Sequence, residues 1–536
     1  MKKVTLFSGY IIEDNELYRD QEAMSKLNKL IQDREVYNVI SQLNGSFRFT
    51  VESETHTWFG IDHFGGYSLF YKTIPNLKII SNPTHEAKLS DIQDNQLCTL
   101  LASGFCYGDN TIFKDVKECH PGVLYTYSKE TQRLTTHEWF RIGSNQQIVR
   151  KKEELSDLLL SLVPNNFRKT HLALTGGVDS RLLLSLFRKR AVQLEVITYG
   201  TANNPDIKLA KDIAQASDLA HHLFYLDKLD LSPYFKAGGL KNFLVTGFLG
   251  RSLPFESDWL VSNMIKGATP WVTTGFTSSW LNSLNPDYQS VPDKETLVAK
   301  IIDLHCRQTL ISSSKFKQII QESVIESLSH FQLDNFESDY HRWNIENRQH
   351  KYIINTSNNY RVNDIEVFIP LFDKRLMTFL NDSSKEQRAD KKLYIDAITS
   401  NIFIGNEAYL NKIPSTNPKF YNPTPQAKHS SSPWKIRLRN LDKHNLNRII
   451  RTPNNQFYGI VQSVLMQSPN YLSLKIEDAF PNLKNVISTL YDLKLTNSAN
   501  HLKWLQKKRV VQLDLLGIEI IGFLAEAYQD KLFDRS

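Results

Sequence analysis

The sequence predicts two folded parts of different class, a strand-rich first part and an α/β second part built around a parallel sheet. In residues 1–140, short runs of β-branched and aromatic residues are separated by Gly, Asn and Pro, as in strands joined by turns. From about residue 151, strand-like runs alternate with helical patterns, which favours parallel strands with helices on both faces. The length of 536 residues exceeds one ordinary core, so two or three domains are expected.

The first part is expected to be a set of strands interrupted by one helix. The helix is predicted over residues 20–43, DQEAMSKLNKLIQDREVYNVISQL, and the polar residues 141–150 are interpreted as a connector. The predicted strands are GSFRFTVES, TWFGIDH, YSLFYKT, LKIISN and GVLYTYS.

The second part is expected to form its sheet from four apolar runs. Helical patterns separate the first three, and a longer mixed segment precedes the fourth. Residues 421–434 are rich in Pro and Ser and indicate a mobile loop or linker, and a helical extension is expected over 435–536. The four strand candidates are HLALTG, LEVITYG, HHLFYLD and PWVTTGF.

Composition and charge argue against several classes of protein. The chain is 41% hydrophobic and 23% charged, which is ordinary for a globular protein and argues against general disorder. Its net charge of +7 is mild for this length and is not concentrated as in most nucleic-acid-binding proteins. The most basic stretch, 435–451, also fits the solvated polar face of a helix, and we therefore expect no nucleic-acid partner. Binding of this stretch to an acidic or nucleic-acid partner is the weaker alternative.

Cysteine usage and hydropathy predict a cytoplasmic protein. The four cysteines form no CxxC pair, so neither a zinc site nor a disulfide framework is indicated. The apolar run near the N-terminus is too short for a signal peptide. The most apolar late stretch, 510–528, is interrupted by Asp514 and Glu519, which suits a buried amphipathic helix and gives no membrane span.

The stretch TGGVDS, from Thr175 to Ser180, lies between a predicted strand and a predicted helix. In parallel α/β sheets, ligands bind at the carboxyl ends of the strands, where this stretch lies. Glycines let the backbone approach a ligand closely or take positive φ, and the N–H groups at a helix N-terminus bind phosphate well. Thr175 and Ser180 add hydroxyls, and Asp179 beside phosphates makes sense if it holds Mg²⁺. Neither the Walker loop nor the dinucleotide fingerprint is present. From these residues alone, a Gly-Gly turn with Asp and Ser capping the helix is the alternative.

LTGGVDSRLLL resembles the SGG-x-DS pyrophosphatase loop of the asparagine synthetase family, with Thr175 replacing the usual serine. Five further stretches resemble segments of the same family in the same order, so that the resemblance covers roughly residues 1–420. They are LNGSFRFTV, FGIDHFGGYSLFYK, TIFKDVKECHPG, YGTANNPDIKLAKDIA and NTSNNYRVNDIEVFIPLFDKRLMTFL.

This resemblance implies the finer fold. Residues 1–140 are expected to form an α+β, Ntn-hydrolase-like β-sandwich similar to class II glutamine amidotransferases. Residues 151–420 are expected to form an α/β N-type ATP pyrophosphatase domain of the adenine nucleotide α-hydrolase kind, with a helical C-terminal part.

The resemblance also implies site residues and cofactors. ATP and Mg²⁺ are the implied cofactors, with Asp179 as the metal ligand and Lys412 and Asp179 in catalytic roles; Lys419 is the weaker lysine candidate. The residues implied to bind ATP are Thr175, Gly176, Gly177, Asp179, Ser180, Asp206 and Gly275.

The chain departs from the family at the glutamine site. Glutamine-using members carry an N-terminal catalytic Cys, whereas this chain begins Met-Lys-Lys and none of its cysteines can be N-terminal. The first part is therefore expected not to hydrolyse glutamine and to be structural or substrate-shaping, as in the β-lactam synthetases and some lasso-peptide cyclases, which it resembles in this respect.

Departures occur in the second part as well. TGFTSSWLNS places Phe276 and Ser279 where the asparagine synthetases carry an acidic residue and the second metal-binding Asp, so either the metal site is rebuilt or activity is weak. Glu366 is expected to order its segment. Glu346 follows Arg342 by four residues, which suits surface stabilisation better than a general base. His221 and His222 are expected to be surface or satisfied core histidines.

The predicted function is an ATP-dependent, AMP-forming amide ligase that joins a small-molecule or peptide carboxylate to an amine without hydrolysing glutamine. The alternative from another class is a non-catalytic ATP-binding or scaffold relative in a biosynthetic complex; tRNA modification is the weakest reading. A homodimer or a biosynthetic partner protein would be compatible with either of the first two.

Overall fold

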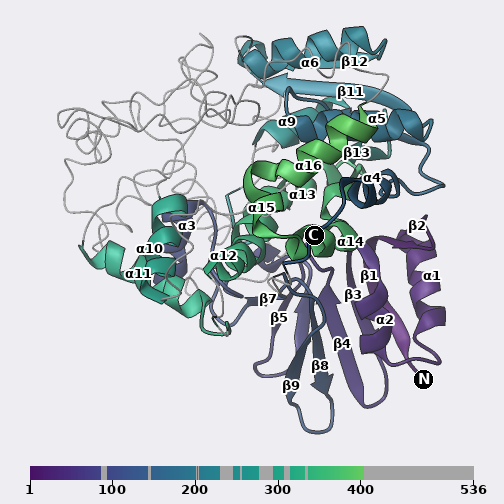
Figure 1. Ribbon diagram of the computed structural model, residues 1–536. Helices are drawn as coiled ribbons and strands as arrows, with labels where there is room; N and C mark the ends of the chain where they lie inside the picture. Colours follow the sequence, from purple (N-terminus) through teal and green to yellow (C-terminus); the bar gives the residue numbers. More distant parts are fainter. Residues whose placement is uncertain are drawn as a thin grey trace.

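Three sheets organise the protein in the computed structural model (Figure 1). The structure describes residues 1–85, 93–142, 147–200, 202, 204–229, 246–253, 256–276, 294–306, 314–331, 333 and 336–403. Two of the sheets are antiparallel and belong to the first part of the chain, and the third is parallel and belongs to the second. The predicted change from antiparallel strands to a parallel α/β arrangement is therefore present.

The larger antiparallel sheet has six strands in the order β2-β1-β3-β4-β8-β9. The first two strands are joined by Asp14 and Asn15, whose positive φ angles of 51° and 59° make the tight turn typical of two-residue hairpins. The strands are β1 (Lys3–Glu13), β2 (Glu16–Arg19), β3 (Asn44–Glu52), β4 (His56–Ile61), β8 (Val123–Ser128) and β9 (Leu134–Glu138).

Helices α1 (Asp20–Leu30) and α2 (Val36–Gln42) supply apolar side chains such as Leu27 and Val39 to a core shared with β1 and β3. The single helix predicted over 20–43 was wrong, because residues 32–35 are Gln-Asp-Arg-Glu and offer no apolar side chain to bury. The chain turns there and restarts as a second helix.

The smaller antiparallel sheet has the order β6-β5-β7, and its apolar side chains share a core with β4 and β8. Aromatic rings fill this core: Phe59 stacks on Tyr125 with ring centroids 5.2 Å apart. The strands are β5 (Phe70–Lys72), β6 (Lys78–Ile80) and β7 (Lys117–Glu118).

The parallel sheet has five strands in the order β12-β11-β10-β13-β14. The chain starts in the middle at β10, adds β11 and β12 on one side, and then crosses to β13 and β14 on the other. The carboxyl ends of β10 and β13 therefore flank the point where the order reverses, which is where open α/β sheets bind ligands. The strands are β10 (Lys169–Ala173), β11 (Gln193–Gly200), β12 (His221–Tyr225), β13 (Trp271–Thr273) and β14 (Glu366–Phe368).

Both faces of the parallel sheet are covered by helices. Successive residues of a strand point to opposite faces of the sheet, so the contacts of Tyr199 and of His221, which pairs with Val196, show what covers each face. Tyr199 of β11 donates a hydrogen bond to Asp258 of α9 (Glu256–Met264), whereas His221 of β12 lies near Lys211 of α6 (Pro205–Ala216) on the other face. The sheet is doubly covered, as the alternating sequence pattern predicted.

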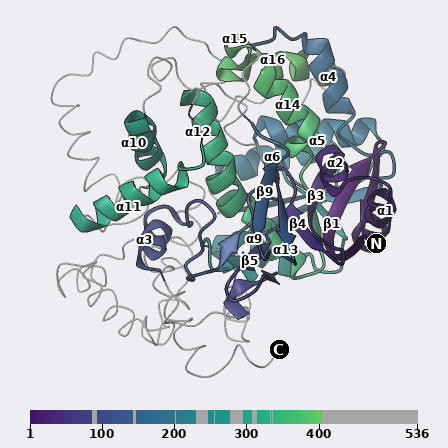
Figure 2. The same ribbon diagram turned by 90° about the horizontal axis from the view of Figure 1, so that it is seen from below.

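The remaining helices belong to the second part, except α3, which lies in the first. Figure 2 shows α10, α11 and α12 grouped to one side of the sheets. The α-helices are α3 (Asp94–Ser103), α4 (Lys152–Leu160), α5 (Val178–Lys189), α10 (Lys294–His305), α11 (Ser314–Ser327), α12 (Phe336–Asn344), α13 (Ser357–Arg361), α14 (Lys374–Asp382), α15 (Lys385–Arg388) and α16 (Lys392–Ala397). Two π-helices follow α12 and α16, at Ile345–Ile353 and Ile398–Ile402. Short 3₁₀ turns lie at Pro83–His85, Leu226–Lys228, Ile354–Thr356, Pro370–Phe372 and Ala389–Lys391.

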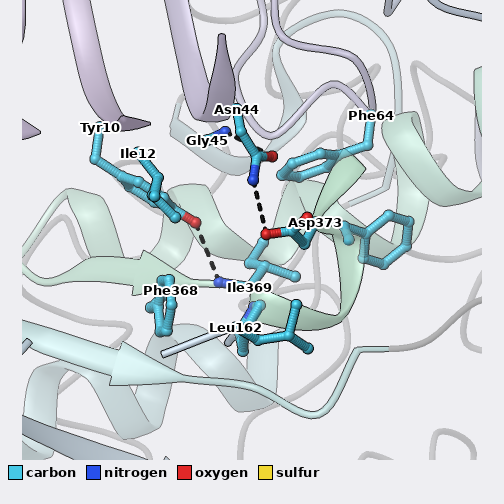
Figure 3. A pocket seen from close by; sticks show the side chains of 11 residues that line it. Tyr10, Ile12, Asn44, Gly45, Phe64, Leu162, Phe368, Ile369 and Asp373 are labelled. Atoms are coloured by element: carbon cyan, nitrogen blue, oxygen red, sulfur yellow. Dashed lines mark hydrogen bonds between the residues drawn. The ribbon is translucent and has the colours of Figure 1, made fainter. Parts of the chain in front are cut away.

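The two parts share one continuous core, because Tyr10, Phe64 and Phe70 of the first part belong to the apolar cluster around the parallel sheet. Figure 3 shows the junction, where the Ile369 N–H donates to the Tyr10 hydroxyl at 3.3 Å and Asn44 donates to Asp373 at 2.7 Å. The cavity between them measures about 10 Å³, which is room for one water at most. The junction is thus packed at this point, whereas beside it a cavity of about 340 Å³ opens between the first part and Lys374 and Arg375.

Within the described part of the chain, no helix has both the length and the apolar character needed to cross a bilayer. The predicted linker at 421–434 and the predicted helical extension at 435–536 lie outside the described residues.

Candidate functional site

The loop between β10 and α5 ties itself together through two hydroxyl groups. Thr175 Oγ1 accepts from the N–H of Gly177 at 3.0 Å, and Gly177 is the N-cap residue of α5. Ser180 Oγ lies 3.1 Å from the carbonyl oxygens of both Thr175 and Gly177. Ser180 is buried, so its hydroxyl shapes the loop from within, while Thr175 and Gly177 are exposed at the helix N-terminus.

The two glycines are needed for space and not for positive φ. Gly177 has an ordinary extended conformation, with φ −68° and ψ 150°, so the expectation that the turn would exploit positive φ was wrong there. A Cβ atom on Gly176 would lie 2.5 Å from Leu209 Cδ2 and 3.0 Å from Asp206 Oδ1. The loop therefore runs close against α6, and Asp206 is brought next to it.

Three loops that follow three parallel strands meet at this place. After β11, Asn204 caps α6 by accepting from the Asp206 N–H at 2.9 Å, which sets Asp206 in the first turn. After β13, a Cβ atom on Gly275 would lie 3.2 Å from the backbone nitrogen of Ser180. The structure thus brings together the sequence-predicted residues Thr175, Gly176, Gly177, Asp179, Ser180, Asp206 and Gly275.

The carboxylate of Asp179 has two partners that sequence reasoning missed. Tyr394 of α16 donates to Asp179 Oδ1 at 2.9 Å, and Lys391 Nζ lies 3.6 Å from Oδ2. Burial is the main cause that raises the pKa of Tyr394, so it acts as a neutral donor. The only sequence signal was a pair of lysines at the start of α16, about 210 residues from Asp179, and nothing in the pattern linked the two segments.

Two predicted features cannot be placed. Lys412, proposed as the catalytic lysine, and Ser279, at the family's second metal-ligand position, lie outside the described residues, as does Lys419. Phe276 is described and is partly buried against the core of the parallel sheet, so it offers packing at the family's acidic position.

The residues present fit a phosphate group with an associated divalent cation. Lys391 and the N-terminus of α5 offer positive charge, and the carboxylates of Asp179 and Asp206 lie beside the loop. The buried hydroxyl of Thr274, at the carboxyl end of β13, has no hydrogen-bond partner among the described residues. A polar ligand bound beside this loop would satisfy such an orphaned group. Asp179 would share its carboxylate between a cation and Lys391.

Two other acidic residues raised by the sequence have structural surroundings. Glu366 is buried and accepts from Arg361 Nε at 2.9 Å and from the hydroxyl of Tyr67, so it ties the first part of the chain to β14, in line with the ordering role expected. Glu346 is also buried, in the π-helix after α12. The expectation of a surface pair with Arg342 was wrong, since that ion pair (2.7 Å) is enclosed.

Glu346 is held by further charged partners. His330 Nε2 lies 3.0 Å from Glu346 Oε2, and His120 Nδ1 lies 3.9 Å from the same oxygen. Hydrogen bonding to His330 and the charge of Arg342 outweigh burial and lower the pKa of Glu346 to about 2. A carboxyl group with that pKa is a poor proton acceptor at neutral pH, which argues against a general base.

Comparisons with known proteins leave the family open. No protein-family model and no curated protein matches the chain. Two solved structures align with it: glutamine phosphoribosylpyrophosphate amidotransferase from B. subtilis complexed with ADP and GMP, and a structure of the allosteric regulatory enzyme of purine biosynthesis. Both are 11% identical over 63% of this chain, covering 75% and 73% of theirs, with TM-scores of 0.19 and 0.18. At TM-scores this low, neither likeness carries an argument about function.

Proposed function

We propose that the protein is an ATP-dependent, AMP-forming ligase that activates a carboxylate and joins it to an amine. The observation that carries the proposal is the meeting of three strand-end loops at the reversal point of the parallel sheet, with Asp179 and Lys391 beside an exposed helix N-terminus. A place of this kind in an α/β sheet is where nucleotide ligands bind.

The proposed reaction has two steps. A substrate carboxylate oxygen attacks the α-phosphorus of ATP, the bond to the β-phosphate breaks, and pyrophosphate leaves; the amine then attacks the acyl-adenylate carbonyl, and AMP leaves. The first N–H groups of α5 and the Lys391 ammonium would bind the departing pyrophosphate. Asp179 would hold Mg²⁺, which supplies further neutralisation of phosphate charge. Catalysis would rest on positioning and charge stabilisation.

Resemblance to the asparagine synthetase family supports this reading over other uses of an ATP site. The first part of the chain would then be a class II amidotransferase-like unit. The amine would be ammonia, a second substrate or a group in the same molecule.

The test is calorimetric titration of Mg²⁺–ATP into the full chain and into Asp179→Asn, which keeps the side-chain shape and removes the charge. We expect clear binding by the first and at least about tenfold weaker binding by the second, equivalent to roughly 1.4 kcal/mol. Asp212→Asn, an exposed acid on α6, is the matched control and should bind as the wild type does. Equal binding by wild type and Asp179→Asn would show that the nucleotide does not bind at this loop.

A non-catalytic ATP-binding relative is the second candidate, and the apolar Phe276 at the family's acidic position favours it. Pyrophosphate–ATP exchange in the presence of amino acids and peptides separates the two. Exchange that depends on a carboxylate supports the ligase, whereas tight Mg²⁺–ATP binding with no exchange for any carboxylate supports the non-catalytic relative.

A further inference from the structure

Three potential metal ligands lie side by side on neighbouring strands of the parallel sheet, away from the candidate ATP site. They are His171 of β10, Glu195 of β11 and His222 of β12, and their ligand atoms all lie within 4.8 Å of one another. His171 pairs directly with Glu195, and His222 pairs with Ile197, two residues further along β11. Because alternate strand residues share a face, all three side chains project from the same side of the sheet.

The group lies toward the amino-terminal half of these strands. Glu195 is the third residue of the eight in β11, and His222 is the second of the five in β12. The loops that form the candidate ATP site leave the opposite ends of the strands. A ligand bound here would therefore contact the sheet itself and would take no part in phosphate chemistry.

The distances suit a small cation. His171 Nε2 lies 3.3 Å and His222 Nε2 lies 2.7 Å from Glu195 Oε2. Nitrogen and oxygen ligands about 2.1 Å from zinc in a tetrahedron are roughly 3.4 Å apart, so small shifts would bring the three atoms around one ion. Two imidazoles with one carboxylate form a donor set suited to zinc and its transition-metal neighbours and poorly suited to Mg²⁺.

The burial of His171 is an independent observation in favour of a metal site. Its side chain is 1% exposed; Nε2 contacts Glu195 Oε2 at 3.3 Å, but Nδ1 has no hydrogen-bond partner within the described part of the chain. An unsatisfied buried imidazole costs free energy, which a metal bond would recover.

Solvent can reach the cluster, and one lysine lies beside it. His222 is 42% exposed, so an ion can enter from solvent and keep a water as its fourth ligand. Lys169 is the one nearby cation that acts on both His171 and Glu195 among the described residues, and it lies two residues before His171 on the same face.

A second cluster, His120, His330 and Glu346, is less suitable. Its carboxylate already accepts from Arg342 Nε at 2.7 Å and from His330, and a guanidinium in contact would repel a cation. We infer that His171, Glu195 and His222 bind a divalent transition-metal ion, with zinc as the natural probe, which clamps β10, β11 and β12 together. This inference does not depend on the proposed ligase function.

The test is zinc titration of the chelator-treated full chain against a chromophoric chelator, with thermal unfolding followed in parallel. The chain offers a matched control, because His221 and His222 are neighbours on opposite faces of β12. We expect His222→Ala and Glu195→Gln to weaken one zinc equivalent by at least about tenfold to 100-fold, and His221→Ala to leave it unchanged. Zinc should raise the unfolding temperature of the wild type and not that of His222→Ala.

Further outcomes decide against the inference. Equal zinc affinity in wild type and His222→Ala, or loss of the site in His330→Ala with retention in His222→Ala, would overturn it. Circular dichroism checks that each variant is folded. Because Glu195→Gln can still hydrogen-bond His222, loss of zinc in that variant would report the missing charge and not a misfolded sheet.

Discussion

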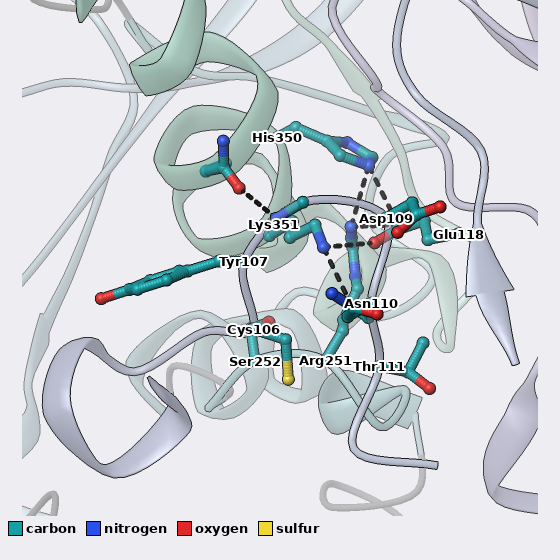
Figure 4. A network of polar contacts seen from close by, with 12 residues as sticks. Cys106, Tyr107, Asp109, Asn110, Thr111, Glu118, Arg251, Ser252, His350 and Lys351 are labelled. Atoms are coloured by element: carbon teal, nitrogen blue, oxygen red, sulfur yellow. Dashed lines mark hydrogen bonds and ion pairs between the residues drawn. The ribbon is translucent and has the colours of Figure 1, made fainter. Parts of the chain in front are cut away.

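Two clusters of charged residues in this protein differ in what surrounds them. The first joins Glu118 of β7 to Arg251, His350 and Lys351 (Figure 4), and each of these side chains is at most 2% exposed. The second joins Asp179 to Lys391 at the mouth of the parallel sheet, where Asp179 is 18% exposed and Lys391 9%. One is sealed by protein on all sides, and the other opens toward the place where a ligand would bind.

The sealed cluster connects segments far apart in the sequence. Glu118 Oε1 lies 2.9 Å from His350 Nε2 and accepts from Arg251, whose Nη2 also donates to Asn355 at 3.0 Å. Burial would raise the pKa of Glu118, but the charges of Arg251 and Lys351, together with the adjacent His350, outweigh it and lower the pKa to about 2. With this much compensation and no access, the cluster is suited to holding the two parts of the chain together.

In the open cluster, Asp179 Oδ2 and Lys391 Nζ are 3.6 Å apart, and both side chains are partly reached by solvent. The comparison teaches that charge inside a fold does not by itself mark a binding site. What distinguishes the Asp179 pair is its place at the ends of parallel strands and its partial exposure.

The largest expected effect is on the sealed cluster. Glu118→Gln leaves Arg251 and Lys351 buried without a counter-charge, so we expect a loss of about 3–5 kcal/mol in the free energy of unfolding. Urea unfolding at pH 7 measures it. Glu52→Gln is the matched control, because Glu52 pairs with Lys129 at the surface, and it should cost under about 1 kcal/mol. A loss for Glu118→Gln as small as that for Glu52→Gln would show that the sealed cluster contributes no more to stability than a surface ion pair.

The same cluster predicts that the free energy of unfolding falls at acid pH. The pKa of Glu118 is about 2 in the folded protein against an ordinary 4.5, so its stabilisation is present above about pH 4.5 and is lost as the pH falls toward 2. The difference corresponds to about 3 kcal/mol. The stability gap between wild type and Glu118→Gln should therefore shrink on acidification, as followed by urea unfolding between pH 7 and pH 3. A gap that stays constant would contradict the assigned charge state.

The smallest effect on stability is expected at the open cluster. Lys391→Met keeps the length and apolar contacts of the side chain and leaves Asp179 hydrogen-bonded to Tyr394, so the free energy of unfolding should fall by about 1 kcal/mol. If the proposed function holds, Mg²⁺–ATP affinity should fall by at least about tenfold, because the lysine proposed to bind phosphate is lost. Lys351→Met, the matching change in the sealed cluster, should cost more stability than Lys391→Met and should leave Mg²⁺–ATP affinity nearly unchanged. Comparable stability losses in both variants would remove the distinction between the clusters.

Local residue patterns were enough to predict much of the fold. The strand around HLAL, the helix that begins after the two glycines, and the alternation that builds the parallel sheet all follow from side-chain periodicity and backbone preference. Those properties depend on neighbours along the chain, so they can be seen in the sequence. The break between α1 and α2 was missed, although the polar residues 32–35 that cause it were visible.

Other features depend on contacts between distant segments, and only the tertiary structure decided them. The sequence alone determined that Thr175 to Ser180 would lie between a strand and a helix at the edge of a sheet. That Lys391 and Tyr394 would reach Asp179, that Glu346 would be enclosed, and that His171 and His222 would share a face with Glu195 were decided by strand order, register and helix packing. The physical reason is that local preference acts over a few residues, whereas these charges meet only after the chain has buried its apolar faces.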